Sequence, residues 1–214
     1  MLPFLTSVSR PHYLHIGLLL TACLAPHHAV AQATEPRAEL PTFRIGDHWR
    51  WERRSGYTGL HEGEIARTVT AITDSEVRGT ENGGEFVMTP DLSVTQTPMF
   101  TVLAGKSIMM SFPLEVGKEW GTDNTFGTAN GFKNGRNDYK VRVVAFEKIR
   151  VPAGEFAAFK IESNGRWYNY RTNTTGVGRA VWWYAPAVRN IVKWDYRDQY
   201  TNSVQELVEV RVQQ

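Results

Sequence analysis

Residues 190–198 read NIVKWDYRD, and this stretch decides the fold class. Val192, Trp194 and Tyr196 alternate with the charged or polar residues between them. Successive side chains of a β-strand point to opposite faces, so one face of this segment is apolar and the other is polar. The pattern predicts an antiparallel strand with one buried face and one face in water.

The same two-residue period recurs along the chain. It is clearest at 49–54 (WRWERR), 156–163 (FAAFKIES) and 204–212 (VQELVEVRV). We expect an all-β fold of about 10–12 strands in a single curved antiparallel sheet, either a half-barrel or barrel-like. Little helix is predicted, at most a turn or two near residues 98–104.

Four Asn-Gly pairs mark expected hairpin turns, because type I′ turns need positive φ at both central residues. The pairs begin at Asn82, Asn130, Asn134 and Asn164. A fifth turn is expected at 151–154 (VPAG). The polar segment 121–138, rich in Gly and Asn, is predicted to extend a hairpin, or alternatively to form a mobile lid over a cavity.

An aliphatic-Gly-x-x-Trp pattern occurs twice, at 45–49 and 116–120, and each copy follows a proline. Each copy predicts a tight turn that leads into a strand beginning with a buried Trp. The repeat indicates either one local solution used twice or two similar halves with a boundary near Ser111.

The first 33 residues resemble an export signal, with one basic residue, Arg10, ahead of an apolar stretch at 16–25. Cys23, the only cysteine, is either removed with this signal or acylated as in a bacterial lipoprotein. The expected organisation is a signal peptide at 1–33, a linker at 34–42 and a single β domain at 43–214. We expect a periplasmic or secreted protein, with an outer-membrane lipoprotein as the alternative.

The charge balance argues against a nucleic-acid partner. The signal holds one of the 24 basic residues and none of the 22 acidic ones, so the mature chain carries a net charge of +1. Acidic and basic residues are interspersed, and no basic stripe is available to neutralise phosphates. No polybasic block points to an anionic membrane surface, so membrane association is expected only through a lipidated Cys23.

Three segments together resemble a family of uncharacterised bacterial exported proteins and lipoproteins. They are 112–120 (FPLEVGKEW), 151–156 (VPAGEF) and 183–186 (WYAP), the last followed by 191–193 (IVK). The family is similar to the LolA/LolB-like half-barrels, and the resemblance implies a curved sheet with an apolar concave face and no known catalytic residues. Where the family has Gly-Val-Gly after the proline, this chain has Ala187, Val188 and Arg189.

The residues predict neither a metal site, nor a cofactor, nor a catalytic residue. Only His48 and His61 remain after cleavage, without the short ligand spacing of a zinc site. No Gly-x-Ser-x-Gly motif is present for a serine hydrolase. A pair of carboxylates for glycoside hydrolysis has no sequence signature, so a hydrolase is kept as a minor alternative.

Aromatic residues supply the best candidate binding site, at Trp167, Tyr168, Tyr170, Trp182 and Tyr184. Consecutive aromatics in one strand face opposite sides, so one set fills the core and the other is accessible or lines a cavity. We assign Trp183 to the core, and Trp182 with Tyr184 to the accessible face. A closed fold with both faces covered is the alternative.

The leading functional hypothesis is non-catalytic binding of a hydrophobic or amphipathic, lipid-like small molecule in the cell envelope. The alternative is a structural or assembly protein that holds an envelope protein by a sheet face or edge.

Overall fold

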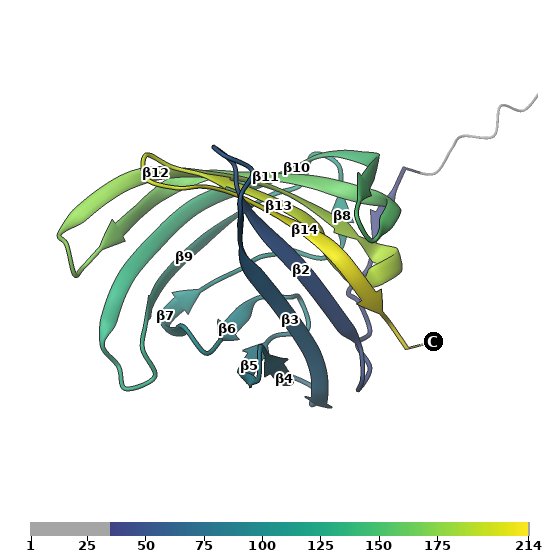
Figure 1. Ribbon diagram of the computed structural model, residues 1–214, viewed down its shortest axis with the longest axis horizontal. Coiled ribbons are helices and arrows are strands. Elements are labelled where there is room, and N and C mark those ends of the chain that lie inside the picture. The colour runs from purple at the N-terminus through teal and green to yellow at the C-terminus, as the bar shows by residue number, and fades with distance from the viewer. Residues whose placement is uncertain (1–34, 214) are drawn as a thin grey trace, which may run out of the picture. The chain divides into compact units, whose positions relative to one another are not determined.

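The computed structural model describes residues 35–213, and the predicted signal peptide with Cys23 lies outside them. This part of the chain is a twelve-stranded antiparallel barrel with one short 3-10 turn, as the alternation of the sequence predicted (Figure 1). Hydrogen bonding runs β10-β11-β12-β13-β14-β2-β3-β4-β5-β6-β7-β9 and closes between β9 and β10. The sheet is therefore a closed barrel rather than an open half-barrel.

The strands differ widely in length. Those of the barrel are β2 (His48–Ser55), β3 (His61–Ile72), β4 (Val77–Glu81), β5 (Gly84–Met88), β6 (Val94–Gln96), β7 (Thr101–Lys106), β9 (Glu119–Gly127), β10 (Lys133–Val151), β11 (Gly154–Asn169), β12 (Thr174–Ala185), β13 (Asn190–Arg197) and β14 (Asn202–Arg211). β1 (Arg37–Ala38) and β8 (Leu114–Glu115) form a separate two-stranded pair. The 3-10 turn η1 is Pro186–Val188.

Part of the predicted linker is packed against the barrel. Ala38 of β1 pairs with Leu114 of β8, and both residues are buried. Residues 98–104, where a helical turn was expected, instead form the turn between β6 and β7 and most of β7. That expectation is wrong because β7 pairs with β9 along residues 101–106.

Two of the four expected Asn-Gly turns are confirmed. Asn82 and Gly83 both have positive φ between β4 and β5, and Gly131 does so between β9 and β10. The turns expected at Asn134 and Asn164 are wrong, because these residues lie within the long strands β10 and β11.

Gly165, which follows Asn164, lies within β11 and does not form a turn. A Cβ on Gly165 would lie 2.1 Å from the carbonyl oxygen of Asp138 on the neighbouring strand. Glycine here permits a close approach of two backbones, which is a common reason for glycine inside a strand.

The repeated Gly-x-x-Trp pattern is one local solution used twice. Gly46 and Gly117 have φ of 91° and 92°, and each donates its N–H to a carbonyl of a neighbouring strand. Trp49, after the first turn, is completely buried and donates to the carbonyl of Val188 at 2.8 Å. Trp120, after the second, is half-buried and donates to Ile108 at 3.1 Å.

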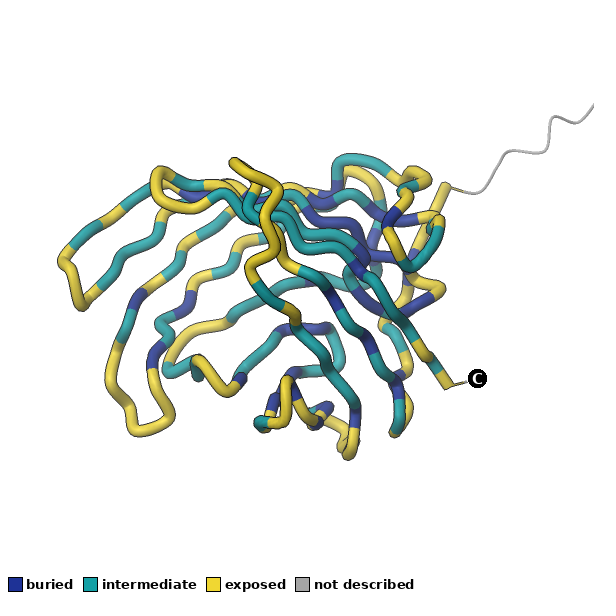
Figure 2. The backbone as a smooth tube through the Cα atoms, in the orientation of Figure 1, coloured by how far each residue is buried: buried dark blue, intermediate teal, exposed yellow. Residues whose placement is uncertain are grey.

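The barrel has two unlike ends. The turns β2–β3, β4–β5, β6–β7, β9–β10, β11–β12 and β13–β14 lie toward one end, here called the mouth, because successive antiparallel strands return there. The turn β10–β11, η1 and the start of β2 lie at the opposite end. Buried residues gather toward the opposite end, at the right of Figure 2, whereas the hairpin turns at the left and top are exposed.

Candidate functional site

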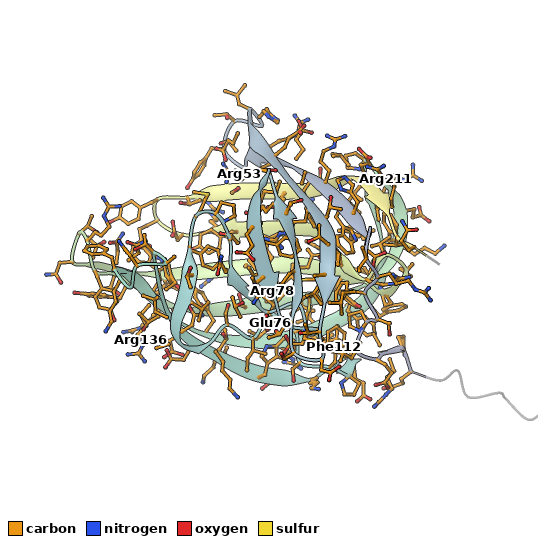
Figure 3. The ribbon with its side chains drawn as sticks, turned by 90° about the horizontal axis from the view of Figure 1, so that it is seen from below. Arg53, Glu76, Arg78, Phe112, Arg136 and Arg211 are labelled. Carbon is orange, nitrogen blue, oxygen red and sulfur yellow. The ribbon has the colours of Figure 1, made fainter. Side chains whose placement is uncertain are left out.

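A segment that links β7 to β8 fills the barrel interior toward the opposite end. Met110 of this segment is fully buried, and the Phe112 ring packs edge-on against Tyr184 with centroids 5.4 Å apart. The segment is fixed to the wall by the Trp120 indole N–H, which donates to Ile108. Figure 3 places Phe112 well away from Arg136, which lies on β10 near the mouth. One end of the interior is therefore a packed core.

A cavity of about 270 Å³ lies between this segment and the inner face of β9–β13. None of its lining side chains is charged. The wall combines aromatic rings with hydroxyl and amide groups, principally those of Asn124, Tyr139, Ser163, Trp182, Trp194 and Tyr196. Its volume is near the lower limit for small-molecule sites.

Two tyrosines place hydroxyl groups in the cavity wall. Burial raises the pKa of both Tyr139 and Tyr196, so both hydroxyls are protonated at neutral pH. Tyr196 donates to Asp198 at 2.9 Å. Gly178 makes room for them, since a Cβ there would lie 2.5 Å from the Tyr139 Oη and 2.8 Å from the Tyr196 Oη.

Trp182 forms the deep part of the wall. It is 2% exposed and stacks on Trp194 with centroids 4.9 Å apart and planes 16° apart. Its indole N–H has no hydrogen-bond partner within residues 35–213. A buried donor without a partner costs free energy, so the wall of this cavity retains an unused hydrogen-bond donor.

A second cavity of about 460 Å³ continues toward the mouth. Asn137 and Tyr196 line both cavities. Trp167 and Tyr200 line the second cavity and pack together with centroids 5.9 Å apart. Arg171, at the β11–β12 turn, is the basic residue among its lining side chains. The interior therefore changes from uncharged near Trp182 to polar near the hairpin turns.

The expected division of the Trp182–Tyr184 stretch is wrong. Trp182 and Tyr184 both face the barrel interior, and Tyr184 is 1% exposed because Phe112 and the core cover it. Trp183 faces outward but is only 9% exposed. The ammonium groups of Lys160 and Lys193 lie 5.5 and 5.8 Å from its ring centroid, and their side chains cover the ring.

The remaining predicted residues divide between the two faces. Trp167 faces inward, whereas Tyr168 takes the opposite face of the same strand. Tyr168 donates to Asn173 and packs edge-on against Tyr170 near the β11–β12 turn. Trp167 and Trp182 thus share the inner face. Tyr168 also borders the second cavity, whereas Tyr170 lines neither cavity. Their role in binding stays a prediction.

Sequence reasoning missed three residues of the inner wall: Tyr139, Trp194 and Tyr196. The alternation in 190–198 did place Trp194 and Tyr196 on one face with Val192. It could not show that Val192 is packed in the core while the other two reach a cavity, because that depends on where the 107–113 segment ends.

The two histidines outside the signal lie apart from the cavity. His48 contacts the Thr68 hydroxyl at 2.8 Å, and burial lowers its pKa, with Arg211 adding to the effect. His61 contacts Glu52 at 2.8 Å on the surface. No group of three metal-ligating side chains occurs within residues 35–213. No helix in this same part of the chain is long and apolar enough to cross a bilayer.

A surface depression of about 900 Å³ lies on the wall formed by β9–β12. Its charged side chains include both signs, and Glu119 and Arg142 pair at 3.5 Å. Mixed charge on an open surface favours no single class of ligand, so the inner cavity is the better candidate site.

Comparisons with known proteins place the fold. No family model and no curated protein matches the sequence. A protein assigned as exported, with a YmcC-like fold, from Bacteroides fragilis is 16% identical with a TM-score of 0.55, covering 81% of this chain and 99% of that chain. The likeness shows the fold alone.

Two further structures match less closely. A protein assigned as a lipoprotein from Parabacteroides distasonis has 16% identity and a TM-score of 0.47, covering 81% of this chain and 99% of that one. The hypothetical lipoprotein YmcC from Escherichia coli has 9% identity and a TM-score of 0.44, covering 76% and 84%.

Proposed function

We propose that this protein binds a hydrophobic or amphipathic small molecule inside the barrel, without catalysis, in the cell envelope. The cavity beside Trp182 and Trp194 carries this proposal, because it is lined by aromatic rings and uncharged polar groups. Burying a charge without a partner is costly, so a cavity of this composition favours an uncharged group over an ionic one.

The chemistry of the wall indicates how such a ligand would be held. Rings of Trp182, Trp194 and Tyr139 supply apolar contact, and the unpartnered Trp182 N–H supplies a donor for an acceptor oxygen after a small rearrangement. The continuation toward the mouth, past Tyr196, leaves space for a longer or more polar portion. An amphipathic molecule with its apolar end inward matches this gradient.

The two alternatives have less support. Assembly through a sheet edge lacks an edge, since each of the twelve barrel strands has two neighbours within residues 35–213. Glycoside hydrolysis needs a pair of carboxyl groups, and neither a carboxylate nor a histidine lines the cavity beside Trp182.

An envelope location agrees with the assignment of the B. fragilis protein as exported and with the predicted signal at 1–33. The predicted similarity to LolA/LolB-like proteins, which rests on sequence motifs, points to the same kind of lipid-like ligand.

Binding is tested with N-phenyl-1-naphthylamine, an uncharged fluorescent probe. The protein is excited at its tryptophans, and the increase in probe emission by energy transfer is measured as the probe binds. Ser163→Leu fills the cavity from β11, and Glu162→Leu, on the opposite face of the same strand, is the matched control. We expect Ser163→Leu to weaken binding about tenfold or more, corresponding to about 1.4 kcal/mol, and the control to bind as wild type. Equal binding by both variants, or no binding by wild type, would reject an internal site.

A further inference from the structure

The hairpin turns of the mouth carry exposed aromatic side chains. Within residues 35–213, five aromatic residues are strongly exposed, and four of them lie on four of the six mouth turns. These four, here called the rim, are Tyr57, Phe132, Tyr170 and Tyr200. Phe132 is 61% exposed and Tyr200 is 69% exposed. An exposed aromatic on one turn is ordinary, but one on each of four separate turns at one end needs an explanation.

The opposite end has a different surface. Its exposed large apolar residues, Leu40, Ile45, Ile72 and Val116, are aliphatic, whereas the mouth turns carry the four aromatics together with Leu60 and Met99. Aromatic side chains have an apolar body, and a tyrosine adds a polar tip. Tyrosine therefore suits the headgroup level of a bilayer, where one end of the side chain is dry and the other is wet.

Two basic residues lie beside the rim. Lys133 and Arg171 flank Phe132 and Tyr170 on the mouth turns, and neither forms an ion pair within the described residues. Asp198, an acidic residue of these turns, accepts backbone N–H groups within its own turn. The mouth therefore offers two cations to an anionic surface, and each contributes about 1 kcal/mol.

The spacing of the rim favours a fluid surface over a rigid protein partner. The turns project separately, as Figures 1 and 2 show at the left and top, and the polar end of the inner cavity opens among them. Stable protein interfaces have a continuous buried centre, which this arrangement does not offer. A bilayer accommodates separate side chains, each entering the interfacial layer at its own point.

We propose that the rim docks this protein, mouth first, onto an anionic lipid bilayer. Tyr57, Phe132, Tyr170 and Tyr200 enter the headgroup layer, and Lys133 with Arg171 contact lipid phosphates. Apart from Tyr170, the residues of this surface could not be predicted from the sequence, because they are separated by up to about 140 positions and form no basic or apolar block. The proposal does not depend on ligand binding in the cavity.

The test is flotation of the full chain with vesicles of equimolar phosphatidylcholine and phosphatidylglycerol, and with vesicles of phosphatidylcholine alone. The rim variant replaces Tyr57, Phe132, Tyr170 and Tyr200 with Ser, and the matched control replaces Leu40, Ile45, Ile72 and Val116 with Ser. All proteins keep residues 1–34, so any contribution of that segment is common to them.

We expect wild type to float with the anionic vesicles, the rim variant to partition about tenfold or more weakly, and the control to resemble wild type. Lys133→Gln with Arg171→Gln should reduce flotation on anionic vesicles only. Thermal melting checks folding, and Tyr57→Ser with Phe132→Ser serves as a milder rim variant because neither ring packs against another aromatic ring.

Three results would overturn the proposal. One is the absence of wild-type flotation, and another is equal flotation by the rim variant and wild type. The third is a wild-type dimer in sedimentation that the rim variant abolishes, which would make the rim an interface between copies. Binding of N-phenyl-1-naphthylamine by the milder variant, Tyr57→Ser with Phe132→Ser, separates this question from the internal site, because neither residue lines either cavity. Loss of docking by this variant with retained probe binding affects only the rim.

Discussion

Trp182 and Trp183 are adjacent, equally large and both buried, yet we expect their truncation to have unequal effects. Trp182 is 2% exposed, so nearly all of the about 200 Å² that a tryptophan buries is inside the barrel. At about 25 cal/mol per Å² its removal costs about 5 kcal/mol. Water that enters the enlarged cavity offsets part of this loss, so we expect Trp182→Ala to cost about 3–4 kcal/mol.

Trp183 lies on the outer surface under flexible side chains. Its truncation loses two cation–π contacts, with Lys160 and Lys193, worth about 0.5–1 kcal/mol each. It also loses a 2.8 Å hydrogen bond to Glu147, whose exposed carboxylate regains water. The lysine chains can collapse over the gap, so we expect a total of about 1–2 kcal/mol.

Urea unfolding of Trp182→Ala and Trp183→Ala measures the difference. A gap of about 2 kcal/mol corresponds to a difference in Tm of about 4–8 °C for a domain of this size. The slope of the unfolding free energy against urea should be unchanged, which confirms that the native states are comparable. Equal losses from the two variants would refute the assignment of Trp182 to the interior and Trp183 to the outer surface.

Three further predictions test the packing and the charges. Gly165→Ala should cost about 2–3 kcal/mol in urea unfolding, because its Cβ would meet the backbone of Asp138, whereas Gly121→Ala, whose Cβ would lie in ordinary contact 3.9 Å from the carbonyl oxygen of Tyr139, should stay within about 0.5 kcal/mol of wild type. Burial raises the pKa of Asp195 above 3.8, so the folded protein loses stability relative to an Asp195→Asn variant as the pH rises from 3.8 through that raised pKa. At neutral pH the Asp195→Asn variant should be more stable than wild type by less than about 1 kcal/mol, because the carboxyl is partly exposed. A stability gain of this variant that persists unchanged in acid would contradict this cause. Arg189→Ala should cost about 3–5 kcal/mol by leaving the fully buried Asp47 carboxylate without its 2.8 Å partner, and adding Asp47→Asn should recover part of that loss in a double-mutant cycle.

The all-β class and the number of strands were predictable because side-chain alternation follows directly from strand geometry. The period at 190–198 is read without knowledge of any other segment. Closure of the barrel was not predictable in this way. It depends on pairing between β9 and β10 on one side and on the short pairing of Gln96 with Thr101 between β6 and β7 on the other.

The candidate site was harder to predict than the fold because alternation gives two faces without saying which is inside. At 182–184 the core face was assigned from Val181, an apolar residue on the same face as Trp183, and both faces proved to be buried for different physical reasons. Trp182 is covered by a protein core, and Trp183 by the aliphatic parts of lysines. The turn prediction from the Asn-Gly pair at Asn164 was wrong for a similar reason, because Gly165 allows two strand backbones to approach closely and does not form a turn.

The departure at Ala187–Arg189 shows how tertiary contacts can replace a glycine. The pattern that the sequence was expected to resemble has glycine at the position of Arg189, and the structure gives this arginine a φ of 56°, in the left-handed region that glycine adopts easily. The strain of a non-glycine residue there is offset by two contacts of its guanidinium, with Asp47 at 2.8 Å and with the carbonyl of Gln213 at 2.6 Å. Asp47 also accepts the backbone N–H groups of Arg44 and Gln213. One side chain therefore ties η1, the turn before β2 and the end of the chain together at the end opposite the mouth, which keeps the packed core closed while the other end of the barrel stays open.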